Sequence, residues 1–253
     1  MKLQGVAAIV TGGASGLGAA TGRALAAAGA KVALLDVNEG AASEVARETG
    51  GIAVACDVAD AASGEAAVAR AAEAHGPARI LVNCAGIAPA SRIVGRNGPH
   101  ALDLYAKVVG VNLIGSFNMM RLVAAGAMAV EPLEGGERGV IISTASVAAY
   151  EGQIGQAAYA SSKAGVVGLT LPAAREFAPA GIRVCAIAPG IFETPMLRGL
   201  PQEVQDSLGA AVPFPSRLGK PEEYAMLAMA IIANPMLNGE VIRLDGALRM
   251  QPK

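Results

Sequence analysis

The stretch Thr11-Gly12-Gly13-Ala14-Ser15-Gly16-Leu17-Gly18 joins a short apolar run, residues 6–10, to a segment of helical period, residues 17–28. A glycine-rich turn between a strand and a helix can bind a phosphate, because glycine lets the backbone approach closely and the first N–H groups of the helix are free. Ala19 stands where a Walker loop requires lysine, so the turn does not predict a P-loop NTPase. It predicts either a dinucleotide site or only close packing of the helix on its strand.

Apolar runs and Ala-rich stretches of helical period alternate along the rest of the chain. The runs are almost continuously apolar, which is typical of parallel strands covered by helices on both faces. We therefore expect a single-domain α/β fold of the Rossmann type over residues 1–253, with a doubly wound, seven-stranded parallel sheet. The expected strands are residues 6–10, 31–36, 52–56, 80–83, 140–143, 182–188 and 240–244. The expected helices are residues 17–28, 41–48, 60–74, 101–130, 157–177 and 222–233.

Two stretches interrupt this alternation, residues 86–99 and residues 189–221. Both follow an expected strand directly. Ligands of open α/β sheets bind beyond the carboxyl ends of the strands, so we expect both stretches to border the binding site. The second is expected to form a substrate loop.

Composition excludes several classes of protein. The 253 residues are 53% hydrophobic and 16% charged, which excludes a disordered chain. The 20 basic and 21 acidic residues nearly cancel, so we expect no nucleic-acid partner. Apolar runs such as residues 224–233 fall short of the ~18 residues needed to cross a membrane, and the first strand begins too early to leave room for a signal peptide. We expect a soluble, cytoplasmic protein with no membrane partner.

Cysteine and histidine usage predicts no metal. Cys56, Cys84 and Cys185 are far apart and form no CxxC motif, so we interpret them as reduced, apolar packing residues. His75 and His100 are isolated from them and from each other.

Asp36 ends the second expected strand, 18 residues after Gly18. This is close to the ~20 residues that separate the glycine turn from the carboxylate that binds the adenosine ribose. A carboxylate there accepts hydrogen bonds from the ribose diol and repels a 2′-phosphate, so the site favours NAD over NADP. The alternative is an Asp that caps a helix or a loop.

Tyr159 and Lys163 are four residues apart in a helical stretch and therefore share a face. Such a pair can also arise by chance on a solvated helix. Ser146 lies just past the expected strand at residues 140–143, at the edge of the sheet where a cofactor binds. All three side chains can therefore face one crevice.

These motifs resemble the short-chain dehydrogenase/reductase family. The resemblance covers nearly the whole chain and rests on the glycine turn, Asn83-Cys84-Ala85-Gly86, Asn112, Ser146, Tyr159-x-x-x-Lys163 and Pro189-Gly190. Residues 144–153, 212–219 and 238–247 resemble more narrowly its type-2 3-hydroxyacyl-CoA dehydrogenase branch. Cys84 departs from the Asn-Asn-Ala-Gly of the wider family, and residues 86–99 match the branch poorly.

The resemblance implies an NAD-dependent enzyme that interconverts a secondary alcohol and a ketone. The implied substrate is a small molecule, a 3-hydroxyacyl-CoA, and the implied assembly is a homotetramer. Three alternatives stay open: a dehydrogenase of steroids or other secondary alcohols, a reductase of 3-oxoacyl thioesters, and a non-catalytic NAD-binding scaffold.

The resemblance also implies the catalytic roles. Tyr159 would be the general base, which requires its phenol pKa to fall from ~10 to about 7, equivalent to roughly 4 kcal/mol. Lys163 would stabilise the phenolate and hold the nicotinamide ribose, and Ser146 would hydrogen-bond the substrate oxygen. Asn112 would form a helix irregularity that keeps a water for proton relay.

The remaining implied contacts are with the cofactor and coenzyme A. The glycine turn contributes Gly12, Gly16 and Gly18, with Ser15 and Leu17 at the phosphate and ribose end. Asp36 would bind the adenosine ribose, Asp57 and Val58 would lie at adenine, Cys84 near the adenosine ribose, and Phe192 and Thr194 near nicotinamide, with Tyr159 and Lys163. Ala85, Gly86, Pro189 and Gly190 are further implied cofactor contacts. Basic candidates for the phosphates of coenzyme A are Arg92, Arg96, Arg198, Arg217 and Lys220.

Overall fold

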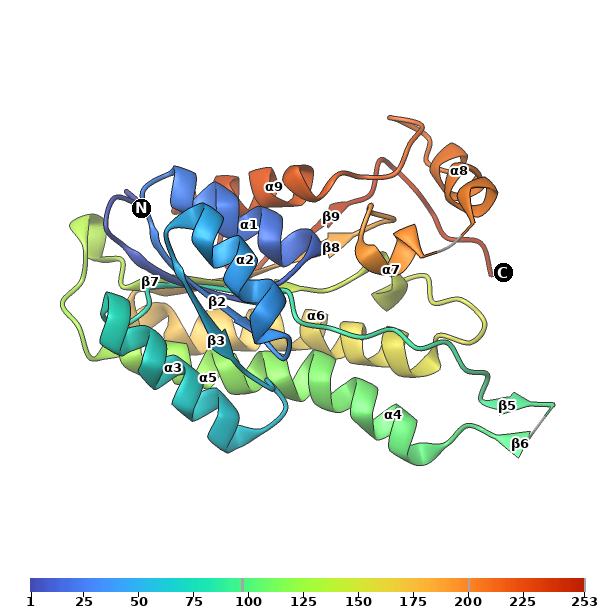
Figure 1. Cartoon of the computed structure of the whole chain (residues 1–253), viewed down its shortest axis with the longest axis horizontal. Helices are drawn as coiled ribbons and strands as arrows, with labels where there is room; N and C mark the ends of the chain where they lie inside the picture. Colours follow the sequence, from blue (N-terminus) through green and yellow to red (C-terminus); the bar gives the residue numbers. More distant parts are fainter. Residues whose placement is uncertain (97, 200, 253) are drawn as a thin grey trace.

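A seven-stranded parallel sheet forms the centre of the computed structural model, which describes residues 1–96, 98–199 and 201–252 (Figure 1). The strand order is β3-β2-β1-β4-β7-β8-β9. The order of connection reverses between β1 and β4, and this switch point is where an open α/β sheet binds its ligand. The strands are β1 Ala7–Thr11, β2 Lys31–Asp36, β3 Ile52–Ala55, β4 Ile80–Asn83, β7 Gly139–Thr144, β8 Ile182–Pro189 and β9 Val241–Leu244.

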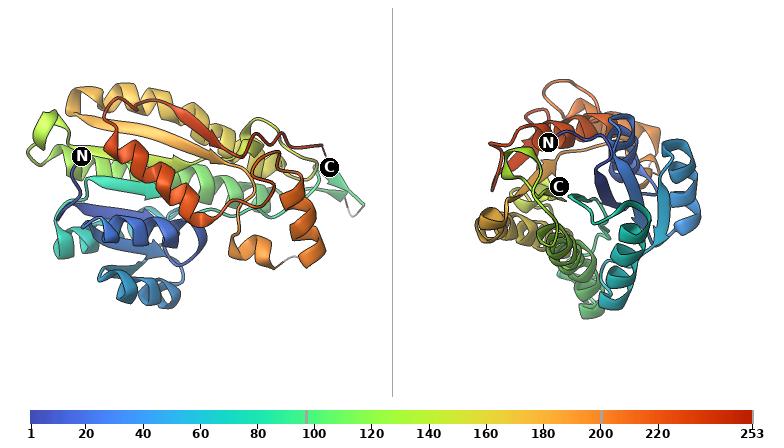
Figure 2. Two further views of the ribbon diagram at one scale, coloured as in Figure 1. Left: turned by 90° about the horizontal axis from the view of Figure 1, so that it is seen from above. Right: turned by 90° about the vertical axis from the view of Figure 1, so that its left-hand side faces the viewer.

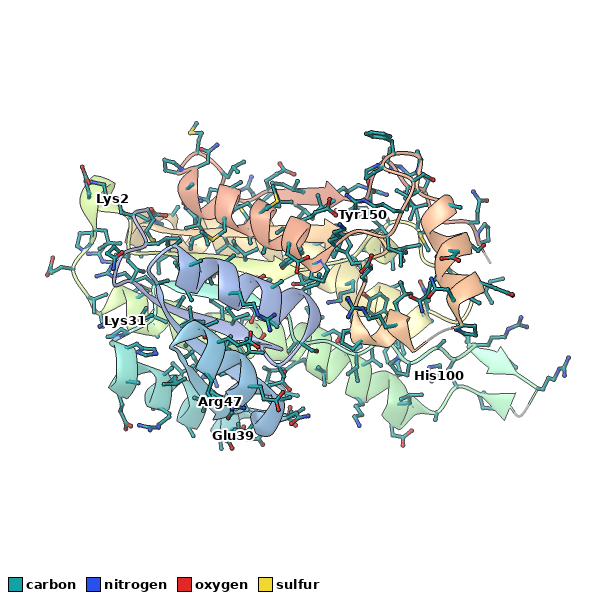
Figure 3. The ribbon with its side chains drawn as sticks, turned by 45° about the horizontal axis from the view of Figure 1, so that its top comes forward. Lys2, Lys31, Glu39, Arg47, His100 and Tyr150 are labelled. Carbon is teal, nitrogen blue, oxygen red and sulfur yellow. The ribbon has the colours of Figure 1, made fainter. Side chains whose placement is uncertain are left out.

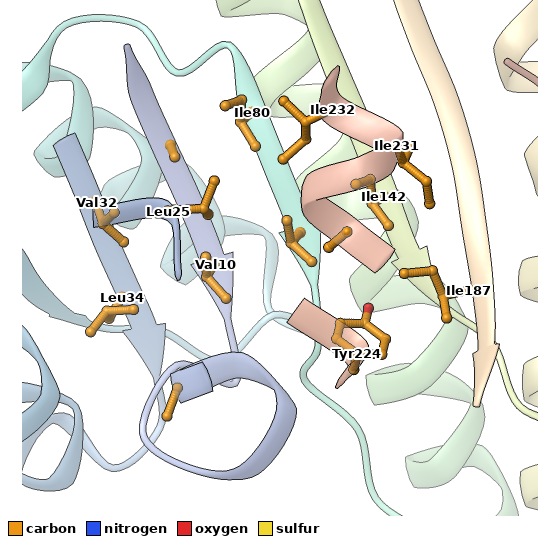
Figure 4. Packing of buried hydrophobic residues seen from close by; sticks show 14 of the residues in the cluster. Val10, Leu25, Val32, Leu34, Ile80, Ile142, Ile187, Tyr224, Ile231 and Ile232 are labelled. Carbon is orange, nitrogen blue, oxygen red and sulfur yellow. The ribbon is translucent and has the colours of Figure 1, made fainter. Parts of the chain in front are cut away.

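Helices cover both faces of the sheet (Figures 1 and 2). Val10 of β1 packs in the apolar cluster under α1, α2 and α9, and its neighbour Ile9 packs in the cluster under α3, α5 and α6. Figure 4 shows the first of these clusters. Charged side chains such as Lys31, Glu39 and Arg47 point outward (Figure 3). The covering helices are α1 Gly16–Ala27, α2 Glu39–Thr49, α3 Ala61–His75, α5 Gly115–Met128, α6 Ala157–Phe177 and α9 Pro221–Ala233.

The expected architecture is confirmed. Each of the seven strands agrees with its expected boundaries to within one residue, and α6 begins and ends at the expected residues. The strands are recognisable in sequence because both of their faces are buried, which leaves a continuous apolar run.

The helix expected over residues 101–130 is divided. It consists of α4 Leu102–Val109, a π-helical turn Gly110–Ile114 and α5. Asn112 lies in the π turn and is fully buried, and its side-chain amide pairs with both the N–H and the carbonyl of Ile87 over 2.9 Å. This pairing fixes the helix against the chain that leaves β4 and accounts for the local irregularity.

The same helical run corrects the expectation about apolar length. Leu102–Met128 spans 27 residues with a mean hydropathy of 1.4, so length and composition alone would allow it to cross a membrane. Half of its apolar window is buried in the fold, where Met119, Met120 and Val123 pack against the sheet. These contacts place that part of the helix in the core of the fold.

The two irregular stretches contain short elements that the sequence analysis did not predict. The first forms a small hairpin, β5 Val94–Gly95 and β6 Gly98–Pro99. The second contains α7 Pro195–Arg198 and α8 Gln202–Ala210, which begin at or just after proline. Proline is well tolerated at the first position of a helix, so here it starts helices rather than breaking them. Figure 1 shows the hairpin and α7–α8 at the same end of the molecule.

A buried arginine holds the C-terminal end of α9. Arg183 of β8 is 7% exposed and donates to the carbonyls of Ile231, Ile232, Asn234 and Leu237 over 2.8–3.1 Å. It also pairs with the carboxylate of Glu137 over 2.8 Å. These bonds satisfy the free carbonyls at the end of the helix.

Candidate active site

A cavity of about 690 Å³ lies at the carboxyl ends of six strands, β1, β2, β3, β4, β7 and β8. Its volume is within the roughly 300–1,000 Å³ of small-molecule sites. Of the residues that the sequence analysis assigned to catalysis or cofactor binding, all except Asn112 line it. It is also lined by residues that sequence reasoning did not assign to the site: Leu35, Val37, Cys56, Ile87, Ala88, Lys107, Val111, Thr144, Ala145 and Pro195. Most of these residues are sequence neighbours of residues that were assigned to the site. That proximity in the sequence is the feature that could have identified them.

The glycine turn is packed too tightly for side chains. Gly12 has a φ of 64°, and a Cβ on it would lie 2.8 Å from the amide nitrogen of Ala85. A Cβ on Gly18 would collide with the carbonyl oxygen of Gly12. The hydroxyl of Thr11 accepts hydrogen bonds from the N–H groups of Cys84 and Ala85, both over 3.2 Å. The turn is therefore fixed against the chain that leaves β4.

Asp36 extends from the end of β2 toward the glycine turn. Its two carboxylate oxygens accept hydrogen bonds from the backbone N–H groups of Ala14, over 3.1 Å, and Asn38, over 3.0 Å. The N-cap of α2 is Asn38, whose side chain accepts from Ala41 N–H over 3.1 Å. Asp36 therefore is not a helix cap, and its carboxylate faces the cavity with lone pairs available for a ligand.

Ser146, Tyr159 and Lys163 meet on one wall of the cavity. Ser146 follows β7, is 6% exposed, and accepts a hydrogen bond from Ala148 N–H over 3.1 Å. The Ser146 hydroxyl lowers the pKa of the Tyr159 phenol, which burial raises. The Lys163 ammonium lies 5.8 Å from the centre of the Tyr159 ring and is 4% exposed. The tyrosine–lysine pair is therefore not a chance pair on a solvated helix face.

The surroundings of Tyr159 differ from what its expected role requires. Burial raises the pKa of the Tyr159 phenol, and the Ser146 hydroxyl offsets this only in part. Burial also lowers the pKa of the Lys163 ammonium to about 8, and the ammonium donates to the Thr144 carbonyl over 2.7 Å. In the chain without its cofactor, desolvation penalises the phenolate. The lowering is expected from Lys163 together with the positive nicotinamide ring of a bound cofactor, so it stays a prediction.

Asn112 does not line the cavity. Its amide donates to the Ser162 hydroxyl over 3.0 Å, and that hydroxyl donates to the Tyr159 carbonyl over 2.7 Å. The side chain thus links the π turn to the helix that carries Tyr159 and Lys163. Its expected role in holding a water stays a prediction.

The segment between Ser146 and Tyr159 is held by the end of the chain. Glu151 accepts from the Arg243 guanidinium over 2.8 and 3.1 Å, and from the backbone N–H of Met250 over 3.0 Å. Arg243 also pairs with Asp245 over 2.7 Å. Sequence reasoning missed this network because its members are about a hundred residues apart.

The basic residues considered for coenzyme A have different surroundings. Arg92 lines a second cavity, of about 400 Å³, between the β5–β6 hairpin and residues 152–157. Arg217 instead forms an ion pair with Glu223, with hydrogen bonds of 2.9 and 2.6 Å. Arg198 lies 3.6 Å from the Glu193 carboxylate. Arg96 and Lys220 are exposed.

The cysteines and histidines have the following environments. All three cysteines are free thiols, but Cys84 lies among hydroxyl groups rather than in purely apolar packing. Within residues 1–96, 98–199 and 201–252, no three His, Cys, Asp or Glu side chains are grouped closely enough to hold a metal ion.

Comparisons with known proteins agree with this geometry. The model of the family described as short chain dehydrogenase matches residues 6–205. The 3-hydroxyacyl-CoA dehydrogenase type-2 of Rattus norvegicus is 52% identical over 99% of this chain and 98% of its own. The protein of that name from Drosophila melanogaster is 50% identical over 99% and 100%. A crystal structure of the Mycobacterium avium 3-hydroxyacyl-CoA dehydrogenase type-2 superposes with a TM-score of 0.92 at 45% identity and covers 98% of both chains.

Proposed function

The chain belongs to the short-chain dehydrogenase family, and we propose that this oxidoreductase converts 3-hydroxyacyl-CoA thioesters to 3-oxoacyl-CoA thioesters with NAD as the hydride acceptor. One observation carries the proposal: the glycine turn, Asp36 and the set Ser146, Tyr159 and Lys163 line the same cavity. A dinucleotide held by the turn and an alcohol held by the set would therefore meet in one space.

The residues present fit a nicotinamide dinucleotide. Gly12 and Gly18 leave no room for a Cβ against the chain's own backbone, and the turn from Gly12 to Gly18 lines the cavity at the start of α1. Asp36 would accept hydrogen bonds from the adenosine ribose. The next residue, Val37, is apolar, so this edge favours NAD over a cofactor with a 2′-phosphate. When bound, the nicotinamide ring supplies the carbon that accepts a hydride.

The chain's own residues would orient the alcohol and move its proton. The Ser146 hydroxyl donates a hydrogen bond to the substrate oxygen, and the Tyr159 phenolate oxygen accepts the hydroxyl proton as the carbon–hydrogen bond breaks. The product is a ketone, and Tyr159 is left as a neutral phenol. Its proton must then pass to solvent before the next turnover.

Lys163 would favour the phenolate form. With its pKa at about 8, the ammonium is mainly charged at neutral pH. A positive charge one helical turn from the phenol stabilises the phenolate, which opposes the effect of burial. Lys163 would also hold the nicotinamide ribose.

The acyl-CoA substrate is supported by the relatives and by the second cavity. Relatives of 50–52% identity over their full length carry the name 3-hydroxyacyl-CoA dehydrogenase type-2. Arg92 lines the second cavity together with Ala157 and Ala160, which stand on either side of Tyr159 in the first turn of α6. A cationic side chain there could pair with a phosphate of coenzyme A.

A substrate panel tests the proposal. Reduced nicotinamide would be followed by absorbance with 3-hydroxyacyl-CoA esters of several chain lengths, a branched 3-hydroxyacyl-CoA and a steroid alcohol. We expect turnover of at least one CoA ester with NAD and weaker turnover of the steroid. Oxidation of the steroid alone, or activity only as an NADPH-dependent reductase, would contradict the proposal.

We further propose that the enzyme is a homotetramer. Ile114 and Phe117, where the π turn meets α5, and Leu171 of α6 are large apolar side chains that stay 44–54% exposed. Apolar faces of this kind are suited to pair across a two-fold axis. Light scattering after size-exclusion chromatography should give four times the chain mass of 25.2 kDa, and a monomer would refute this part of the proposal.

A further inference from the structure

Tyr224 of α9 is a phenol in an apolar environment. It is 0% exposed and belongs to the cluster formed with Val10, Ile142 and Ile187 (Figure 4). A phenylalanine would bury the same ring at this position. The hydroxyl therefore needs a polar partner to offset its desolvation.

That partner is Thr144, the last residue of β7. The two hydroxyl oxygens lie 2.7 Å apart, and the Thr144 hydroxyl is 2.6 Å from the carbonyl oxygen of Asn83. A carbonyl can only accept, so the single hydrogen of the Thr144 hydroxyl goes to Asn83. Tyr224 consequently donates to Thr144, and the Cys84 thiol, 3.8 Å away, can donate to Tyr224.

Thr144 also holds Lys163, through its main chain. Its carbonyl oxygen accepts from the Lys163 ammonium over 2.7 Å. The next N–H, that of Ala145, is bound to the carbonyl of Ile187 over 2.8 Å. The peptide group between Thr144 and Ala145 therefore accepts the hydrogen bond from Lys163. It is held on one side by the Thr144 side chain and on the other by the hydrogen bond to β8.

We propose that Tyr224 is a positioning residue for Lys163 and acts through Thr144. Its hydroxyl fixes the Thr144 side chain, and this keeps the Thr144 carbonyl aimed at the ammonium. The inference rests on the role of Lys163 given above. In the part of the chain that the structure describes, the ionisable groups facing this ammonium are Cys84, which follows β4, and Tyr159 of its own helix.

Tyr224→Phe tests the proposal because it removes one oxygen and keeps the ring. Ile231→Val is the matched control, since Ile231 is equally buried on α9 but has an apolar side chain. The first readout needs neither cofactor nor substrate: acetic anhydride labelling of Lys163, followed by mass spectrometry across a pH series. We expect the apparent pKa of Lys163 to fall by roughly half a unit in Tyr224→Phe, because its hydrogen-bonded charged form is less well held, and to stay unchanged in Ile231→Val.

The second readout is kinetic. Tyr224→Phe should lower kcat about threefold to tenfold with little change in KM, the size of one weakened hydrogen bond, while Ile231→Val should keep its kcat. Thr144→Val removes the acceptor of the same bond, so adding Tyr224→Phe to it should cause no further fall in kcat. Additive effects, or equal Lys163 labelling in Tyr224→Phe and Ile231→Val, would overturn the proposal. Failure of the enzyme to oxidise any 3-hydroxyacyl-CoA would contradict only the proposed function, since the labelling does not depend on turnover.

Discussion

The Lys163 ammonium lies 5.8 Å from the centre of the Tyr159 ring, and its hydrogen bond goes to the Thr144 carbonyl rather than to the phenol. The lysine therefore acts on the phenol by its charge across a short distance. Lys163 is buried and Tyr159 is half-buried, so the charge is less screened than it would be on the surface. The lysine can therefore stabilise the Tyr159 phenolate without forming a hydrogen bond to the phenolate oxygen, which stays available to accept the substrate proton.

The pH dependence follows from the direction of the Tyr159 shift. Burial raises the pKa of this phenol, so its phenolate fraction is small near neutral pH and increases as pH rises. We expect kcat/KM for alcohol oxidation to increase with pH through neutrality, and ketone reduction to slow over the same range. Lys163→Met should move the rise to still higher pH, because the positive charge that favours phenolate is lost. An oxidation rate independent of pH between about 6 and 9 would contradict the assignment of Tyr159 as the base.

Ser146→Ala should lower kcat by about 100-fold with little change in KM, because the lost hydroxyl stabilises charge that develops in the transition state. Ser161→Ala is the control: Ser161 is exposed on the same helix as Tyr159 and bonds the Tyr105 hydroxyl over 2.9 Å, away from the cavity. Steady-state kinetics would check both variants. Equal kcat values in the two would remove Ser146 from the mechanism.

Asp36→Asn should weaken NAD binding about tenfold, because a carboxylate acceptor for the ribose hydroxyls is replaced by a neutral amide. Binding of NADP should change less, since the repulsion of its 2′-phosphate is relieved. Glu39→Gln removes an exposed negative charge three residues along the chain and should leave NAD affinity unchanged. Calorimetric titration would separate these outcomes, and equal weakening in both variants would point to a general charge effect.

Arg183→Met should lower the free energy of unfolding by about 3 kcal/mol and the Tm by about 10 °C, because it removes the guanidinium that pairs with Glu137 and satisfies the carbonyls at the end of α9. Arg47→Met is the control, since Arg47 is exposed on α2. Differential scanning calorimetry would measure both. A Tm for Arg183→Met within a degree or two of the control would show that the buried network contributes little.

The fold could be predicted closely from the sequence because burial on both faces makes each strand a continuous apolar run. The cavity could be predicted because its residues follow strand ends: Gly12 after β1, Asp36 at the end of β2, and Ser146 after β7. The parallel arrangement then brings these ends together.

Features that depend on distant contacts could not be predicted. The resemblance implied an irregularity at Asn112, but its form, a π turn at Gly110–Ile114 bonded through Asn112 to Ile87, is not encoded in the local helical pattern. Tyr224 lies in an apolar helical stretch, so its hydroxyl gave no signal of its bond to Thr144. The raised pKa of Tyr159 likewise depends on burial in the folded chain.

The central claim is that Tyr159 is the base, and the most direct test is Tyr159→Phe assayed with NAD and a 3-hydroxyacyl-CoA. Loss of one hydroxyl should leave the Kd for NAD within about twofold of the wild-type value and lower kcat by at least about 100-fold. A Tyr159→Phe enzyme that keeps the wild-type kcat would contradict the account.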